Sequence, residues 1–176
     1  MARSGPKPGN SIGPVAETSV AELFHEAMAS LASGVCVITA RRADGVPCGL
    51  AATAVASYSA NPPSLLVSVD HGSRCHGALT ECERFGVHIL GADEEPLARV
   101  FAGKGDDKFA DVRWRWDGDV PELEGALAYL RCVRADNFQR YDHTILIGDL
   151  DGGRLAPGEP LLYARRRMDW LLQTGS

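Results

Sequence analysis

The apolar residues of this chain fall in short runs separated by turn residues, and this pattern constrains the fold more than any other feature. The runs have the length of β-strands and cover residues 35–39, 65–69, 85–90, 130–135 and 144–150. No rhythm of strand, long helix and strand appears, and no GxGxxG sequence follows a strand, which disfavours a parallel α/β sheet and a Rossmann domain. The pattern predicts a mainly β fold, a mostly antiparallel β-barrel with peripheral helices.

Turn signals divide the first half of the chain. Asp44-Gly45 follows the first apolar run and predicts a hairpin whose second strand continues towards Tyr58. Asn61-Pro62-Pro63 then breaks the chain before the next strand.

Two helices are expected beside the strands. Ser19 and Glu22 have the spacing of a capping box, and apolar residues recur on one face of the segment that follows, so a helix is predicted over residues 20–33. A short helical segment is expected near residues 76–83.

Length and charge limit the class of protein. A chain of 176 residues with 45% hydrophobic content can close one core, so we expect one domain over residues 18–176 after a flexible tail, rich in Gly, Pro and Ser, at residues 1–17. The net charge of -5 disfavours nucleic-acid binding. No apolar run approaches the roughly 20 residues of a membrane span, and residues 1–17 lack the apolar stretch of a signal peptide, so a cytoplasmic protein with no membrane association is expected.

The five cysteines are odd in number, widely spaced and contain no CxxC pair, so neither a disulfide framework nor a metal site is expected. They are predicted to be reduced and structural. Cys75 is the exception to follow, because it lies in a candidate binding turn.

The segment 48–59 carries mostly small side chains. Small residues let a flat ring approach the backbone, whose N–H and C=O groups can pair with the ring edge, while Thr53 and Ser57 add hydroxyls. A tightly packed barrel strand explains the same composition.

Two further segments could bind a phosphate. Ser73 and Arg74 follow a strand and precede a helix, where unpaired N–H groups, a hydroxyl and a fixed cation can meet an anion. Lys104 and Lys108 lie in a Gly-containing loop between two aromatic residues and could reach the same phosphate. An N-cap with a solvated arginine, and a solvated loop, are the structural alternatives.

A fourth segment is Tyr141-Asp142-His143-Thr144, just before a predicted strand. A histidine beside an aspartate can serve a site, although a lone histidine is more often a surface or core residue. Trp114 and Trp116 are two apart, as on one strand face, and are interpreted as packing residues.

The order of these blocks resembles the family of short-chain flavin reductases that serve two-component flavin-dependent monooxygenases. The resemblance runs from about Phe24 to Trp170. Similar blocks include Phe24-x-x-Ala27-Met28-x-x-Leu31-x-x-Gly34-Val35, Gly49-Leu50 to Ser59, Asn61-Pro62-Pro63, Ser73-Arg74, Phe85 to Leu90, Pro121-x-Leu123-x-Gly125-Ala126, Asp142-His143-Thr144 and Pro160-Leu161-Leu162-Tyr163.

The resemblance implies an FMN-binding split barrel that forms a homodimer with flavin at the subunit interface. It implies hydride transfer from NADH or NADPH to FMN or FAD, and delivery of reduced flavin by diffusion to a partner monooxygenase. Carried onto this sequence, the flavin-binding residues are Ala51, Ala52, Thr53, Ser57, Ser73, Arg74, Cys75, Lys104 and Lys108. Asp142 and His143 are the donor-binding residues, and His143 is the catalytic candidate.

The sequence departs from the family pattern at three places. Ala51 stands where the family often has a hydroxyl residue, Tyr141 replaces the glycine of a Gly-Asp-His motif, and residues 165–167 are three arginines in place of a pattern with His and Gly. Two alternatives stay open at this point. The chain could bind flavin without using a donor, or it could apply bound flavin to an organic substrate. Abundant Ala, Gly and Arg indicate a GC-rich bacterial genome, which favours a role in secondary metabolism.

Overall fold

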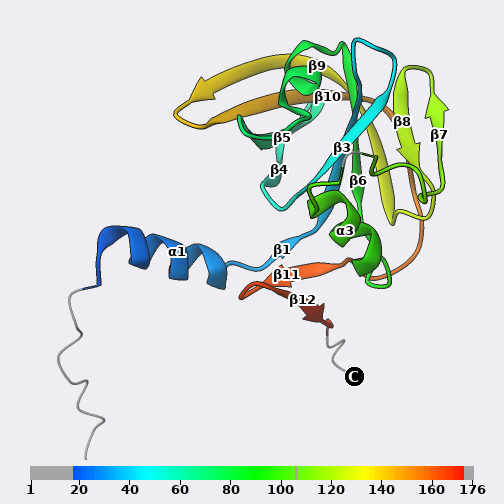
Figure 1. Cartoon of the computed structure of the whole chain (residues 1–176). Helices are drawn as coiled ribbons and strands as arrows, with labels where there is room; N and C mark the ends of the chain where they lie inside the picture. Colours follow the sequence, from blue (N-terminus) through cyan, green and yellow to red (C-terminus); the bar gives the residue numbers. More distant parts are fainter. Residues whose placement is uncertain (1–17, 106, 173–176) are drawn as a thin grey trace, which may run out of the picture.

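The computed structural model describes residues 18–105 and 107–172, and one antiparallel sheet dominates this part of the chain (Figure 1). Its strands, in spatial order, are β3 (Pro47–Ala52), β2 (Cys36–Arg41), β6 (Arg84–Ile89), β9 (Ala128–Arg140), β10 (His143–Leu155), β5 (Pro63–Asp70) and β4 (Val55–Ala60). In the described residues no hydrogen bonds join the edge strands β3 and β4, so the sheet curls without closing. The expectation of a mainly β, barrel-like fold is confirmed.

Smaller elements surround this sheet. β1 (Ser33–Gly34), β11 (Leu162–Ala164) and β12 (Arg167–Trp170) form a small sheet, and β7 (Trp114–Asp117) pairs with β8 (Val120–Leu123). The helices are α1 (Val20–Ser30), α2 (His76–Glu81) and α3 (Glu95–Ala102). The tail expected at residues 1–17 lies outside the described residues.

The prediction for the segment that leads to Tyr58 was wrong. The extended segment expected to continue to Tyr58 is two strands, because β3 ends at Ala52 and β4 begins at Val55. β3 pairs with β2, whereas β4 pairs with β5 at the opposite edge of the sheet. A run of small residues lacks the alternation of apolar and polar side chains that specifies a strand partner. The break at Thr53 and Ala54 could therefore not be read from composition.

β2 contributes side chains to two hydrophobic cores, because its residues are buried on both faces of the sheet. Cys36, Ile38 and Ala40 contribute to the core inside the curled sheet. Val37 points the other way, into a second core that includes Phe101 of α3. Side chains of a strand alternate between its two faces in this way. α3 packs on β2 and β3, on the face to which Val37 points.

α3 approaches β3 closely at Gly49. A Cβ at this position would lie 2.6 Å from Cε1 of Phe101 and 3.3 Å from the carbonyl oxygen of Ile38. Glycine is thus required for the Phe101 ring to rest on the strand. The contact fixes α3, and the loop after it, next to β3.

α1 lies outside both cores. Its capping box is present as predicted: the Ser19 N–H donates to Glu22 Oε2 at 2.9 Å, and the Glu22 N–H donates to Ser19 Oγ at 3.2 Å. The helix ends at Ser30 rather than Ser33, because Leu31 is already extended. Within the described part of the chain, none of its residues is buried, and Figure 1 shows it projecting from the body.

No helix among the described residues is long and apolar enough to cross a membrane.

Candidate functional site

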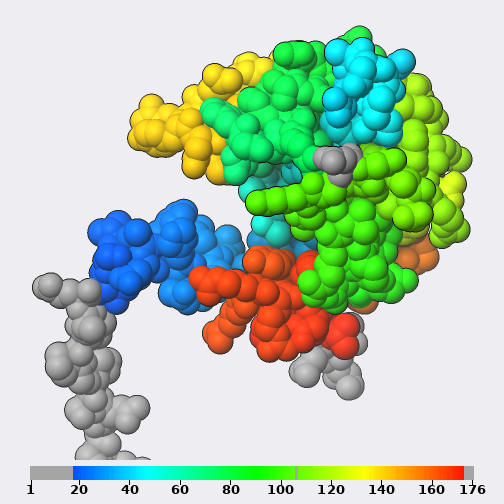
Figure 2. All heavy atoms as spheres, in the orientation of Figure 1, coloured from blue at the N-terminus to red at the C-terminus, as the bar shows by residue number. Residues whose placement is uncertain are grey.

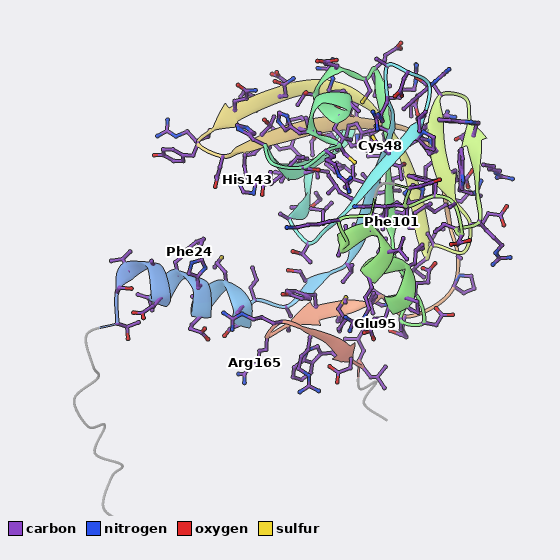
Figure 3. All side chains as sticks on the ribbon, viewed as in Figure 1. Phe24, Cys48, Glu95, Phe101, His143 and Arg165 are labelled. Carbon is purple, nitrogen blue, oxygen red and sulfur yellow. The ribbon has the colours of Figure 1, made fainter. Side chains whose placement is uncertain are left out.

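A cavity of about 1450 Å³ lies between β3, the turn that follows β5, the loop that follows α3, and the start of β10. Figure 3 labels three of its lining residues, Cys48, Phe101 and His143. Most of the residues predicted for the site also line it. They are Ala51, Ala52, Thr53, Ser73, Arg74, Cys75, Lys104, Lys108 and His143.

Two predicted residues are not part of the lining. Ser57 is exposed on β4, where it is paired with Leu65 of β5. Asp142 is largely exposed, and it contacts the cavity through His143, whose Nδ1 lies 2.9 Å from Asp142 Oδ1.

The turn before α2 differs from the sequence expectation. The N–H groups there were expected to be unpaired, but those of Gly72, Ser73, Cys75 and His76 all have acceptors within the turn. Ser73 Oγ, for example, accepts the Cys75 N–H at 3.2 Å. Asp70, at the end of β5, accepts the Gly72 N–H and the Ser73 N–H. An anion at this turn would therefore be held mainly by side chains.

Arg74 joins this turn to the loop after α3. Its guanidinium donates to the carbonyl oxygens of Lys104 and Gly105. Two segments that are thirty residues apart in sequence are thus held together at the cavity, and both Arg74 and Lys104 line it. The Arg74 side chain is exposed and is also bound to these backbone carbonyls.

Lys108 is the most enclosed cation of the cavity. Its Nζ donates to the carbonyl oxygen of Phe101 at 2.7 Å and, more weakly, to that of Gly49 at 3.4 Å. Partial burial lowers the pKa of Lys108, and the neighbouring Cys75 opposes this effect. The ammonium group thereby connects the end of α3 to β3.

The lining carries more positive than negative charge. Its cations are Arg42, Arg74, Lys104 and Lys108, and its carboxylates are Asp70 and Asp107. Asp70 is already engaged by the Gly72 N–H, and Asp107 accepts the Phe109 N–H at 3.1 Å. A chain with a net charge of -5 therefore concentrates positive charge where a phosphate could bind.

The segment around His143 packs directly on the turn before α2. The His71 N–H donates to the carbonyl oxygen of Asp142 at 2.8 Å. The buried hydroxyl of Thr144 lies 3.0 Å from Nε2 of His71 and 2.8 Å from Nε2 of His76. These contacts position the half-exposed imidazole of His143 at the cavity.

Tyr141 does not enter the cavity. It occupies the turn between β9 and β10 with a φ of +53°, a left-handed conformation that favours glycine. Its ring is exposed, and the Arg140 guanidinium lies 4.6 Å from the ring centre. The bulk of this side chain therefore lies away from the residues that line the site.

Sequence reasoning missed Arg42 and Trp114 and assigned Cys48 only a structural role, yet all three line the cavity. Trp114 had been interpreted as packing, and it does pack on Phe109, with ring centres 5.3 Å apart. No sequence signal placed Trp114 of the β7–β8 hairpin at the same cavity as β3, because only the tertiary fold brings these elements to one site.

A family model described as the flavin reductase like domain matches residues 28–172. The chain belongs to this family. The resemblance found in the sequence is thereby confirmed.

Several relatives of this chain match it over about four fifths of its length. It is 38% identical over 144 residues to the reductase component of a 4-nitrophenol 4-monooxygenase/4-nitrocatechol 2-monooxygenase from Rhodococcus opacus, covering 82% of this chain and 77% of the relative. It is 38% identical over 150 residues to a flavin reductase (NADH) from Kitasatospora aureofaciens, covering 82% and 78%. An NADH:FAD oxidoreductase from Streptomyces globisporus, solved with NAD and FAD fragments, has a TM-score of 0.77 at 30% identity, covering 82% of this chain and 88% of that chain.

The cavity of this flavin reductase family member fits a flavin. Its volume is ample for a cofactor of that size. Gly49 and Ala51 to Ala54 form a wall of small residues against which a flat ring can lie. Arg74, Lys104 and Lys108 carry positive charge of the kind that suits a phosphate.

Proposed function

We propose that this chain is an NADH-dependent flavin reductase, which reduces FMN or FAD and supplies the reduced flavin to a partner monooxygenase. The proposal rests on one observation in a chain of the flavin reductase family. Four features line the same cavity: the small residues of β3, the turn with Ser73 and Arg74, the lysine loop that carries Lys104 and Lys108, and His143. The Rhodococcus relative is named as the reductase component of a monooxygenase, and the Kitasatospora relative as an NADH enzyme.

Each part of the cavity has a separate task. A bound flavin supplies the ring that accepts a hydride, and the protein supplies binding and orientation. Ala51, Ala52 and Thr53 offer backbone and hydroxyl groups to the ring. Ser73, Arg74, Cys75, Lys104 and Lys108 hold the phosphate end.

His143 and Asp142 bind the donor. The carboxylate of Asp142 holds the imidazole through the 2.9 Å contact at Nδ1, which leaves Nε2 for a ligand. The hydrogen bond from His143 also lowers the pKa of Asp142, so this carboxylate is ionised at neutral pH. The reduced flavin then leaves by diffusion, and we place the reaction in the cytoplasm, where NADH is available.

We also propose that the protein works as a homodimer, with a second copy covering α1. Leu23, Phe24 and Met28 of α1 are 62%, 59% and 49% exposed, and an isolated helix of eleven residues is marginal in water unless its apolar face is packed. The end of the β9–β10 hairpin adds Phe138, which is 55% exposed. Figure 2 shows an open hollow between α1 and this hairpin. One apolar face repeated on two copies can form a closed, two-fold interface.

The function is tested by following the absorbance of reduced nicotinamide with purified full-length chain. NADH is mixed with the protein alone, with FMN and with FAD. Turnover that requires added flavin, and no other acceptor, supports the proposal. Flavin binding without NADH oxidation would identify a carrier, and NADH oxidation that requires an organic acceptor would identify a different flavoenzyme. Either result would overturn the proposal.

A further inference from the structure

Two cysteines face each other in the wall of the cavity. Cys48 lies in the first half of β3, and Cys75 ends the turn that precedes α2. Both line the cavity and belong to the same buried core cluster, and each side chain is the largest influence on the pKa of the other. All five cysteines are free thiols, and the other three, Cys36, Cys82 and Cys132, are not in the lining.

The surroundings make Cys75 the reactive member of the pair. The hydrogen bond from Cys48, the Lys108 ammonium, the backbone at Gly49 and the Ser73 hydroxyl together lower the pKa of Cys75 to about 7, against the opposing effect of burial. The hydrogen bond to Cys75, together with burial, raises the pKa of Cys48. Cys75 therefore loses its proton more readily than the other four cysteines, with the protonated Cys48 thiol as its neighbour.

The other cysteines lack this environment. Burial raises the pKa of Cys36 and of Cys82 to about 11, and that of Cys132 to about 12. Because the thiolate is the form that reacts with oxidants, these three thiols are expected to be inert under conditions in which Cys75 reacts.

We propose that Cys48 and Cys75 form a reversible disulfide when peroxide accumulates, and that this disulfide weakens flavin binding in the cavity. The second half of the inference rests on the proposed flavin reductase function. Reduced flavin that meets dioxygen instead of a monooxygenase returns to oxidised flavin and produces hydrogen peroxide. The oxidant therefore arises from the product of this enzyme.

The chemistry balances with hydrogen peroxide as the only oxidant. The Cys75 thiolate attacks one peroxide oxygen, so that an S–O bond forms, the O–O bond breaks and hydroxide leaves to become water with one added proton. Cys48 then attacks the sulfur of the resulting sulfenic acid, the S–S bond forms, and the hydroxyl leaves as water with the Cys48 proton. Two thiols are oxidised by two electrons, and one peroxide is reduced to two waters.

The consequence for flavin follows from the position of the bond. A disulfide holds its two sulfurs about 2.05 Å apart, which draws β3 and the turn before α2 together. Ser73 and Arg74 belong to that turn, and Lys108 loses the thiolate beside it. The disulfide thereby alters three groups of the proposed phosphate site and narrows the space beside the small-residue strand.

The bond is tested on full-length protein that has been reduced, freed of reductant and exposed to hydrogen peroxide. Peptide mass mapping after alkylation is expected to show a Cys48–Cys75 cross-link, with a loss of about 2 Da from the intact chain. Cys48→Ser is expected to stop at a sulfenic acid on Cys75, which dimedone traps. Cys82→Ser is the matched control and should form the cross-link as the parent does. Oxidation at other cysteines first, or a chain that keeps both cavity thiols while peroxide is consumed elsewhere, would overturn the proposal.

The effect on binding is measured by FMN titration of the oxidised and the re-reduced chain. In the parent and in Cys82→Ser, we expect oxidation to weaken FMN binding at least tenfold and dithiothreitol to restore it. In Cys48→Ser, which cannot form the disulfide, we expect oxidation to leave FMN binding unchanged. An oxidised chain that binds FMN as tightly as the reduced chain would refute the effect on flavin. The mass map needs neither NADH nor turnover, so failure of the disulfide and failure of the proposed function give different results.

Discussion

Arg74 illustrates how one side chain can serve both the fold and the site. Its guanidinium holds the Lys104 and Gly105 carbonyls and lines the cavity with the same group. Removing it should cost both a direct contact to a flavin phosphate and the placement of Lys104.

We therefore expect Arg74→Ala to weaken FMN binding by about 1.5–3 kcal/mol, the range for a hydrogen bond to a charged group. Titration of FMN into the reduced protein measures this loss. Arg99→Ala is the matched control, because Arg99 pairs with Glu95 on α3 and does not line the cavity. Equal affinity in the Arg74 variant and the control would remove Arg74 from the site.

His143→Ala should impair the donor more than the flavin. We expect a tenfold to hundredfold rise in the donor KM or fall in the rate of hydride transfer, equivalent to roughly 1.4–2.8 kcal/mol. Stopped-flow reduction of flavin-loaded protein at several NADH concentrations separates the two effects. Asp142→Asn should show a smaller change of the same kind, since Asp142 acts through His143. Parent kinetics in both variants would make this corner of the cavity structural.

His88 sets a pH limit on stability. It is buried, its Nδ1 contacts the Val37 carbonyl oxygen at 3.2 Å, and its Nε2 accepts the Leu123 N–H at 3.0 Å. Burial lowers the pKa of His88 to about 4, below the value of about 6.5 in the unfolded chain. The neutral ring stabilises the fold fully above pH 6.5, and this contribution is lost as the pH falls through 4.

The loss should amount to roughly 3 kcal/mol of unfolding free energy between pH 6.5 and pH 4. Urea unfolding at several pH values measures it. His88→Gln keeps one donor and one acceptor without titrating, so its curve should be flatter over this window although its stability at pH 7 is lower. Parallel curves for the two proteins would contradict a neutral His88.

At the scale of elements, the contact between β3 and α3 decides the shape of the cavity. Gly49 lets the Phe101 ring rest on β3, and Lys108 hydrogen-bonds both the Phe101 and the Gly49 carbonyls. A change in the distance between β3 and α3 should therefore also move Lys108 and the loop that carries it.

Gly49→Ala should destabilise the fold by about 1–3 kcal/mol, because a Cβ 2.6 Å from Phe101 forces the ring or the helix to move. FMN binding should weaken as well. Thermal unfolding and FMN titration measure the two effects. Gly34→Ala is the control, since Gly34 is also a strand residue and its Cβ would meet no atom within 4 Å. Similar losses in both variants would show that the contact with Phe101 is unimportant.

At the scale of the whole molecule, we expect a second copy of the chain to pack on the exposed apolar face of α1. We expect sedimentation to give about twice the chain mass of 18.8 kDa. Phe24→Asp should shift the protein towards monomer and weaken FMN binding. Leu155→Asp, at a site that is 82% exposed, should leave the dimer intact. A parent chain that sediments as a monomer and still binds FMN tightly would refute the homodimer.

The candidate site was predicted more completely than the fold around it. Thr53, Arg74, Lys108 and His143 were named because their chemistry suits a phosphate, a ring or a donor, and the structure brings all four to one cavity. Ser57 was named by its hydroxyl alone, and it lies on β4 at the other edge of the sheet. Residue type indicates what a side chain can do, but the strand partner decides where it is.

The sequence by itself determined the strand-rich antiparallel fold, the capped first helix and the order of the binding segments, because these follow from local periodicity, capping and motif spacing. Only the tertiary structure decided which strands are neighbours and which residues meet across the cavity. The break at Thr53–Ala54 sends β4 to the far edge of the sheet, and the curl of the sheet brings Cys48 against Cys75. Such contacts depend on long-range packing, which is specified by the shape of whole faces and leaves no short pattern in the sequence.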